Sequence, residues 1–138
     1  MSRILSIDYG LKRTGLAVTD PLQIVATGLA TVETRLLISF LKDYFLREPV
    51  ELIIVGEPKN LDNTDTDATA LVLAFIRQLG LQFPEIPVKK VDERFTSKLA
   101  SQSIRQSVAK KKDRRNKGLI DEVAATILLQ GYMTANNP

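Results

Sequence analysis

The chain has 138 residues, 44% of them hydrophobic and 25% charged, which is typical of one globular domain and excludes two large domains or a disordered chain. It has no cysteine and no histidine, so disulfides, thiolate nucleophiles and triads with an imidazole base are excluded, and hydrolysis would rest on carboxylates, lysines, hydroxyls or a metal. The net charge of +3 mildly favours polyanionic partners. The sequence shows no apolar run of membrane-spanning length and no signal peptide, so we expect a single cytosolic domain over 1–138 and no membrane partner.

The first part of the chain predicts three strands and a helix. The first strand is apolar on both faces until it reaches Asp8, which is typical of a central strand covered on two sides. The second follows closely enough to be its hairpin partner, and the third is weakened by Gly28. The expected elements are strands at 3–8, 14–19 and 24–32 and a helix at 35–47.

The second part alternates strands and helices. The apolar run at 52–56 follows a helix, so we expect it to lie parallel to the first strand. In the next helix, Thr66 or Asp67 is expected to form the cap and Gly80 the end. The expected elements are strands at 52–56 and 88–91 and helices at 68–79, 97–108 and 119–133, with a polar loop at 57–66.

This order of elements predicts an α/β fold with a mixed five-stranded sheet. Three antiparallel strands would form a meander, two parallel strands would extend it, and helices would cover both faces. In such a sheet, ligands bind beyond the carboxyl ends of the parallel strands.

Three acids are expected at that edge of the sheet. Asp8 ends the first strand, Glu93 follows the last strand, and Asp121 opens the final helix on the face that packs on the sheet. Three converging carboxylates without histidine form a hard, oxygen-rich site that suits Mg²⁺ or Mn²⁺ and, with such metals, phosphodiester hydrolysis. The alternative for each acid alone is structural: Asp8 as a turn residue, Glu93 in an ion pair, and Asp121 at a helix N-terminus.

Four sequence blocks carry a resemblance to a known family. They are "DYGLKRTGLAVTD" at 8–20, "IVGEPKNLD" at 54–62, "DERFTS" at 92–97 and "DEVAATILLQGY" at 121–132. Together, in this order, they resemble the YqgF-type family, also called RuvX-like Holliday junction resolvases. The resemblance implies a ribonuclease H-like fold and a metal-dependent nuclease, with one or two Mg²⁺ or Mn²⁺ ions, in which Asp8, Glu93 and Asp121 match the acidic positions of the family.

The resemblance also implies two substrates, which the residues themselves do not separate. Members of the family are associated with processing of the 5′ end of precursor 16S ribosomal RNA, and were earlier proposed to resolve Holliday junctions. The partner is therefore expected to be structured RNA or branched DNA. A monomer could trim an RNA end, whereas cutting two strands of a junction favours a homodimer.

The second block departs from the family pattern at Glu57, where a small or apolar residue usually follows the glycine. This position ends the strand beside the first one, where the resemblance to resolvases and ribonucleases of this fold implies a carboxylate. We therefore predict Glu57 as an auxiliary metal ligand, with an ordinary loop acid as the alternative. The loop after it also lacks the glycine that is common in the family.

Basic residues cluster near the expected acids. They are predicted to neutralise backbone phosphates, and a solvated connector between helices is the alternative. No aromatic ladder is interleaved with them, so recognition of backbone and shape is expected. The predicted nucleic-acid-binding residues are Lys12, Arg13, Arg94, Lys110, Lys111, Lys112, Arg114, Arg115 and Lys117.

Two other functions remain open from the sequence. The opening "SIDYGLKRTGLAVTD" is also similar to the first phosphate loop of the sugar kinase and actin group, but that group needs two such domains. A non-catalytic nucleic-acid-binding factor in ribosome assembly or transcription is the second alternative.

Overall fold

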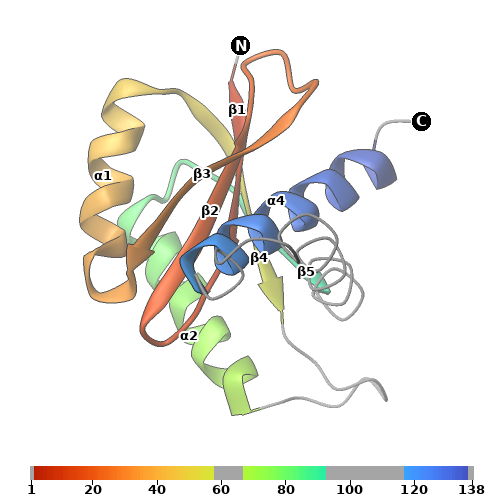
Figure 1. The fold of residues 1–138 in the computed structure, drawn as a ribbon. Coiled ribbons are helices and arrows are strands. Elements are labelled where there is room, and N and C mark those ends of the chain that lie inside the picture. The colour runs from red at the N-terminus through yellow and green to blue at the C-terminus, as the bar shows by residue number, and fades with distance from the viewer. Residues whose placement is uncertain (1, 58–66, 93–116, 137–138) are drawn as a thin grey trace, which may run out of the picture.

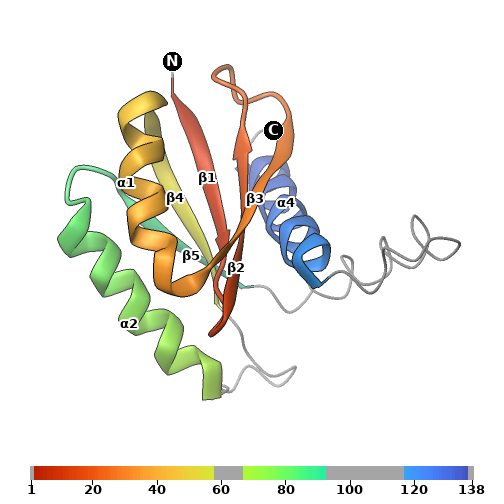
Figure 2. The ribbon, with the colours of Figure 1, turned by 60° about the vertical axis from the view of Figure 1, so that its left-hand side comes forward.

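The computed structural model describes residues 2–57, 67–92 and 117–136, and the side chains within them except those of Asp67, Asp92, 117–121 and Asn136. The described elements form three layers, with a central sheet between helices (Figures 1 and 2). The strands are β1 (Arg3–Asp8), β2 (Arg13–Thr19), β3 (Ala26–Glu33), β4 (Val50–Glu57) and β5 (Val88–Asp92). The helices are the short 3-10 helix η1 (Thr34–Leu36), α1 (Leu37–Arg47), α2 (Asp67–Gln82) and α4 (Lys117–Asn136).

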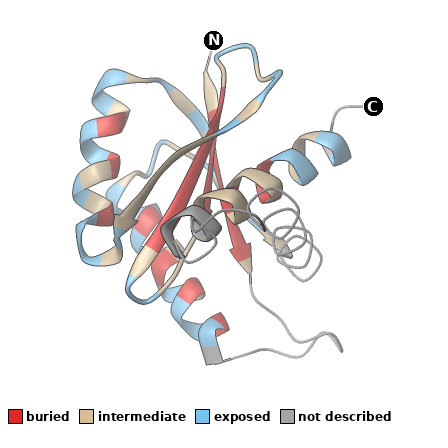
Figure 3. Cartoon of the chain, viewed as in Figure 1, coloured by how far each residue is buried: buried red, intermediate tan, exposed pale blue. Residues whose placement is uncertain are grey.

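The sheet has the mixed topology that the sequence predicts. Its strand order is β3-β2-β1-β4-β5, in which β1 pairs antiparallel with β2 and parallel with β4, β2 pairs antiparallel with β3, and β4 pairs parallel with β5. The central position of β1 follows from its composition, because Ile4, Leu5, Ser6 and Ile7 are all buried (Figure 3).

Each face of the sheet has its own hydrophobic core. Alternate residues of the strands, such as Leu5 and Ile7 of β1, pack under α1 and α2. The residues between them, such as Ile4 of β1 and Ile54 of β4, pack against Ala125 and the leucines of α4. Figure 2 shows α1 and α2 on one side of the sheet and α4 on the other. The two faces therefore carry different helices and can carry different functions.

The predicted boundaries hold with a few corrections. The last helix, α4, already begins at Lys117, so Asp121 lies one turn inside the helix and does not open it. Gly80 does not end α2, which continues to Gln82; nothing lies within 4 Å of the Cβ position at Gly80, and the residue is exposed. The helix expected from residue 35 begins as the 3-10 turn η1 and ends as expected, with the Glu48 N–H donating to Tyr44 O over 2.9 Å. The helix expected at 97–108 lies outside the described residues.

Candidate functional site

Asp8 ends the buried central strand. It lies opposite Gly15 of β2 in the antiparallel register and is partly buried. Strand alternation places Asp8 on the same face as Ser6, which is the face covered by α4. The sheet thus carries a carboxylate to its edge at the end of a strand whose position is fixed by aliphatic side chains.

One buried hydrogen bond fixes α4 over β1. The Ser6 hydroxyl, which is fully buried, donates to Ala125 O over 2.9 Å. Asp8 is two residues beyond Ser6, about 6.5 Å along the strand. Position 121 is four residues before Ala125, about 6 Å along the helix. Figure 2 shows α4 beginning at the end of the sheet where β1 ends, so positions 8 and 121 are displaced from this contact toward the same end.

The third predicted acid, Glu93, lies outside the described residues, immediately after β5. Asp92, the last residue of β5, pairs in register with Glu57 at the end of β4. Because β1, β4 and β5 are parallel, their carboxyl ends lie at the same edge of the sheet. The strand that precedes Glu93 therefore ends at the edge where Asp8 lies.

Glu57 is described, and it contacts a lysine. Its carboxylate lies 3.4 Å from the Lys90 ammonium, and its side chain is 12% exposed against 51% for Lys90. Lys90 pairs in register with Val55, which belongs to the core under α1 and α2. Strand alternation places Glu57 on that same face, opposite to the face of Asp8. The prediction of Glu57 as a metal ligand therefore competes with an ion pair that the structure shows.

The turn between β1 and β2 is tightly built. A Cβ atom at Gly10 would collide with the Arg13 carbonyl, so the chain can turn this closely only with glycine. The Thr34 hydroxyl donates to Gly10 O over 2.6 Å and shares a 2.9 Å hydrogen bond with the buried Thr14 hydroxyl. The Thr34 N–H donates to Lys12 O over 3.0 Å. Three hydrogen bonds thus fix the turn that follows Asp8 against η1.

The predicted basic residues are only partly described. Lys12 is exposed in the turn after Asp8, and Arg13 is partly buried at the start of β2. Lys117 opens α4, and its side chain is not described. The other predicted basic residues, Arg94, Lys110, Lys111, Lys112, Arg114 and Arg115, lie outside the described residues.

The chemistry of the predicted donors suits a hard cation, because all three predicted acids offer carboxylate oxygens and the chain has no histidine or cysteine. Among the side chains that the structure describes, no group of three or more acids, histidines or cysteines lies close enough to hold a metal ion. Of the three predicted ligands, only the side chain of Asp8 belongs to the described part of the chain.

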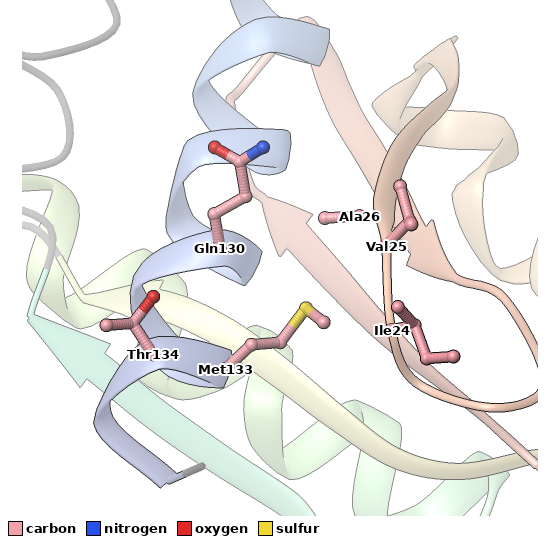
Figure 4. A pocket seen from close by; sticks show the side chains of 6 residues that line it. All are labelled: Ile24, Val25, Ala26, Gln130, Met133 and Thr134. Carbon is pink, nitrogen blue, oxygen red and sulfur yellow. The ribbon is translucent and has the colours of Figure 1, made fainter. Parts of the chain in front are cut away.

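A separate pocket lies at the opposite end of the sheet from Asp8. It has a volume of about 570 Å³ between the β2–β3 loop and the C-terminal half of α4, and Figure 4 shows Met133 facing Ile24 across it. The loop is held by Asp20, whose carboxylate accepts from the Ile24 and Val25 N–H groups over 2.7 and 2.8 Å. These hydrogen bonds, that of Val25 first, lower the pKa of Asp20. Neither the pocket nor the loop brings predicted site residues together.

Sequence reasoning missed the residues that position the site. The sequence places Ser6 in an expected strand without a role of its own, and it distinguishes neither Thr14 nor Thr34. The signal for Ser6 is a hydroxyl within a run of aliphatic residues in a central strand, because a buried polar group needs a hydrogen-bond partner.

Among the described residues no helix is long and apolar enough to span a membrane.

Comparison with known proteins gives a match over nearly the whole chain. The family described as "RuvX: Holliday junction resolvase" matches residues 2–135. A protein of Flavobacterium johnsoniae is 52% identical over 135 residues, covering 98% of each chain, and one of Phocaeicola vulgatus is 55% identical over 133 residues, covering 96% of each. Both carry the name of a candidate pre-16S rRNA nuclease.

Solved structures share the fold. T. thermophilus RuvC in complex with a Holliday junction substrate superposes with a TM-score of 0.59 at 18% identity, covering 99% of this chain and 97% of RuvC. The Holliday junction resolvase of fowlpox virus gives a TM-score of 0.55 at 14% identity, covering 96% of this chain and 98% of the viral one. These likenesses confirm the expected ribonuclease H-like α/β fold.

Proposed function

The chain belongs to the RuvX family of Holliday junction resolvases, and we propose that within this family it acts on structured RNA, at the 5′ end of precursor 16S ribosomal RNA. The membership confirms the predicted family and the predicted class of enzyme, a hydrolytic nuclease that acts on nucleic acid. The proposal concerns the substrate, the metal, the residues of the site and the place of action. Because its substrate would be a ribosomal precursor, the protein would work in the cytoplasm.

The observation that carries the site is the position of Asp8. This carboxylate ends the central parallel strand, on the face where Ser6 fixes α4 and at the end where α4 begins. We propose that Asp8, Glu93 and Asp121 hold Mg²⁺ or Mn²⁺. When bound, such a cation activates water and stabilises the leaving oxygen of the phosphodiester. Asp8 ends a buried strand of the sheet, so the position of this carboxylate is set before the substrate arrives.

The basic residues have a separate role in the proposal. Lys12 is exposed in the turn that follows Asp8, where its ammonium can pair with a backbone phosphate next to the bond that is cut. Arg13, Arg94 and the predicted cluster from Lys110 to Lys117 would extend this contact. Phosphate contacts of this kind release counterions, so binding is expected to weaken steeply as salt rises.

The substrate choice rests on the relatives. Proteins that are 52% and 55% identical over nearly the full chain carry the name of a pre-16S rRNA nuclease. The second candidate is branched DNA, which the family description favours and which the RuvC structure contains. A non-catalytic role in ribosome assembly is the third. These candidates differ in whether cleavage occurs and on which substrate.

A cleavage assay with a matched variant tests the proposal. Purified protein is incubated with precursor 16S RNA, a four-way DNA junction and a simple duplex, with Mg²⁺ or Mn²⁺. Asp8→Asn is expected to abolish cleavage of the RNA while its thermal unfolding stays close to wild type. Asp43→Asn removes an exposed acid of α1 and serves as the control, with unchanged cleavage.

The outcomes separate the candidates. Cleavage of the junction but not of the RNA would favour the resolvase function, and the mass of the active species would then show whether a homodimer is needed. Equal cleavage by wild type and Asp8→Asn, or none by either, would contradict the proposed nuclease site.

A further inference from the structure

A second pocket lies beside the turn that follows Asp8. Its volume is about 370 Å³, within the roughly 300–1,000 Å³ that small-molecule sites occupy. It opens on the face of the sheet that carries α1 and α2, so α4 does not cover it. Figure 2 shows the start of α1 and the end of β1 at the same end of the sheet. Its lining includes Tyr9, Leu11, Thr34, Arg35, Phe75 and Gln78.

One wall of the pocket is aromatic. The rings of Tyr9 and Phe75 are stacked, with centroids 4.4 Å apart and planes 20° apart. Leu11 lines the same pocket and is 73% exposed, so its apolar side chain is accessible to a ligand. A flat, weakly polar group would pack against this wall and cover the exposed leucine.

The walls are fixed relative to each other. Tyr9 and Leu11 belong to the turn, whereas Thr34 and Arg35 belong to η1. The Thr34 hydroxyl and N–H bind Gly10 O and Lys12 O, over 2.6 and 3.0 Å, and so tie the two segments together. The pocket is thus formed before a ligand binds, which lowers the entropic cost of binding.

The polar groups of the pocket suit a neutral ligand with hydrogen-bonding edges. Gln78 supplies an amide, which both donates and accepts. The Arg35 guanidinium lies 2.9 Å from the Glu33 carboxylate, so the two opposite charges leave little net charge at this side of the pocket. A stacking wall, an amide and a balanced arginine match a nucleobase, which has a flat face and edges with donors and acceptors.

We propose that this pocket binds one unpaired nucleobase of the nucleic acid, at the same edge of the sheet as the bond that is cut. This rests on the proposed function, because the strand would have to pass over Asp8. Tyr9 follows Asp8 at the end of β1, and the two side chains leave this edge of the sheet on opposite faces, so a nucleic-acid strand that passes Asp8 reaches the pocket by turning around the edge. A free nucleotide has the same chemistry, and the experiment includes it as a separate arm.

Binding is measured without metal, so that cleavage does not interfere. The probe is a single-stranded RNA octamer with a 5′ fluorophore. It is compared with a series of the same octamer in which each member lacks the base at one position. At one position only, the abasic change is expected to weaken binding about tenfold, because a stacked base contributes this much or more. Gln78→Ala is expected to weaken binding of the intact octamer about fivefold. Gln82→Ala, an exposed glutamine of the same helix outside this pocket, is the control.

The decisive result is non-additivity. If the pocket holds that base, Gln78→Ala has no further effect on the octamer that lacks it. Equal losses at every abasic position, or equal affinities of Gln78→Ala and Gln82→Ala, would overturn the inference while leaving the cleavage assay untouched. Binding of free nucleoside monophosphates as tightly as the octamer would overturn the assignment to the substrate strand. If the binding losses follow this non-additive pattern but wild type does not cleave the precursor RNA, the base-binding pocket is supported and the proposed nuclease substrate is contradicted.

Discussion

The hydroxyl of Ser6 donates a 2.9 Å hydrogen bond to the carbonyl of Ala125, 119 residues away in sequence and fully within the core. It is a polar contact in the otherwise apolar interface between β1 and α4. Asp8 lies two residues beyond one partner, and position 121 lies four residues before the other. This contact therefore sets the register between two of the elements that carry the proposed site.

Replacing Ser6 with alanine is expected to affect stability and cleavage together. The Ala125 carbonyl keeps its helical hydrogen bond, so the loss is that of one buried hydrogen bond, about 1 kcal/mol in the free energy of unfolding. For a chain of this size that lowers the Tm by roughly 2–5 °C. Cleavage should fall further than stability explains, because α4 can then shift over β1.

Thermal unfolding and the cleavage rate of Ser6→Ala are measured beside those of Ser39→Ala. Ser39 is exposed on α1, where alanine is the better helix former, so that control should be neutral or slightly stabilised. A Tm of Ser6→Ala at or above that of wild type would show that the contact does not hold α4.

The fold was predictable because its signals are local and repeated. The central place of β1 follows from aliphatic residues on both of its faces, and β4 is apolar in the same way. Parallel pairing of β4 followed from the helix between them. The continuation of α2 past Gly80 was not predictable. An exposed glycine destabilises a helix by only about 1 kcal/mol relative to alanine, and the neighbouring turns can offset this free energy.

The site was predictable only in part. Asp8 could be placed at the sheet edge because a single strand sets its position. The Ser6 and Thr34 contacts join segments 119 and 24 residues apart, and no periodicity reports such pairings. The ion pair of Glu57 with Lys90 depends on which face each strand presents, which the order of elements does not give.

Gly28 is expected to be required for the close approach of α4 to β3. A Cβ atom at this position would overlap the Glu122 carboxylate and come within 2.8 Å of its Cγ. Gly28→Ala should therefore lower the free energy of unfolding by about 1 kcal/mol, since the glutamate has to move from its packed position.

The effect of Gly28→Ala on the free energy of unfolding should change sign when the glutamate is removed. In a Glu122→Ala background, Gly28→Ala is expected to be neutral or stabilising, because alanine lowers the conformational entropy of the unfolded chain. Gly80→Ala is the control, with nothing within 4 Å of the added Cβ and a gain of roughly 0.5–1 kcal/mol. Urea unfolding of the single and double variants gives these values, and an unchanged penalty in the double variant would exclude the contact with Glu122.

The β2–β3 loop should respond to pH through Asp20. Hydrogen bonds from the Val25 and Ile24 N–H groups lower the pKa of its carboxyl in the folded protein below the ordinary value of 3.8. The charged form thus stabilises the fold above pH 3.8, and this contribution is lost as pH falls through the lowered pKa. The Tm difference between wild type and Asp20→Asn should be largest near pH 6 and shrink below pH 3.8.

The control for this pH series is Glu85→Gln, which removes an exposed acid of another loop. Its Tm difference from wild type is expected to be small throughout. A difference for Asp20→Asn that grows on acidification would contradict the sign of the shift.

Glu57 allows a direct choice between an ion pair and a metal ligand. Its carboxylate is 3.4 Å from Lys90, and by strand alternation both lie on the face opposite to Asp8. Because Lys90 is half exposed, solvent screens the pair, and a double-mutant cycle of Glu57→Gln and Lys90→Met should give a coupling of only about 0.5 kcal/mol. The more exposed pair of Asp43 and Arg47, at 3.2 Å within α1, should give a smaller one.

Metal titration then separates the two roles, because only a ligand changes the affinity for Mn²⁺. If the ion pair is the function of Glu57, Glu57→Gln binds Mn²⁺ as wild type does, cleaves at the wild-type rate, and shows the coupling to Lys90. If Glu57 is an auxiliary ligand, the same variant binds Mn²⁺ about tenfold or more weakly. Lys90→Met then strengthens Mn²⁺ binding, because it frees the Glu57 carboxylate from the ion pair and removes a positive charge near the metal. The opposite responses of the two variants to one titration decide whether β4 contributes to the metal site.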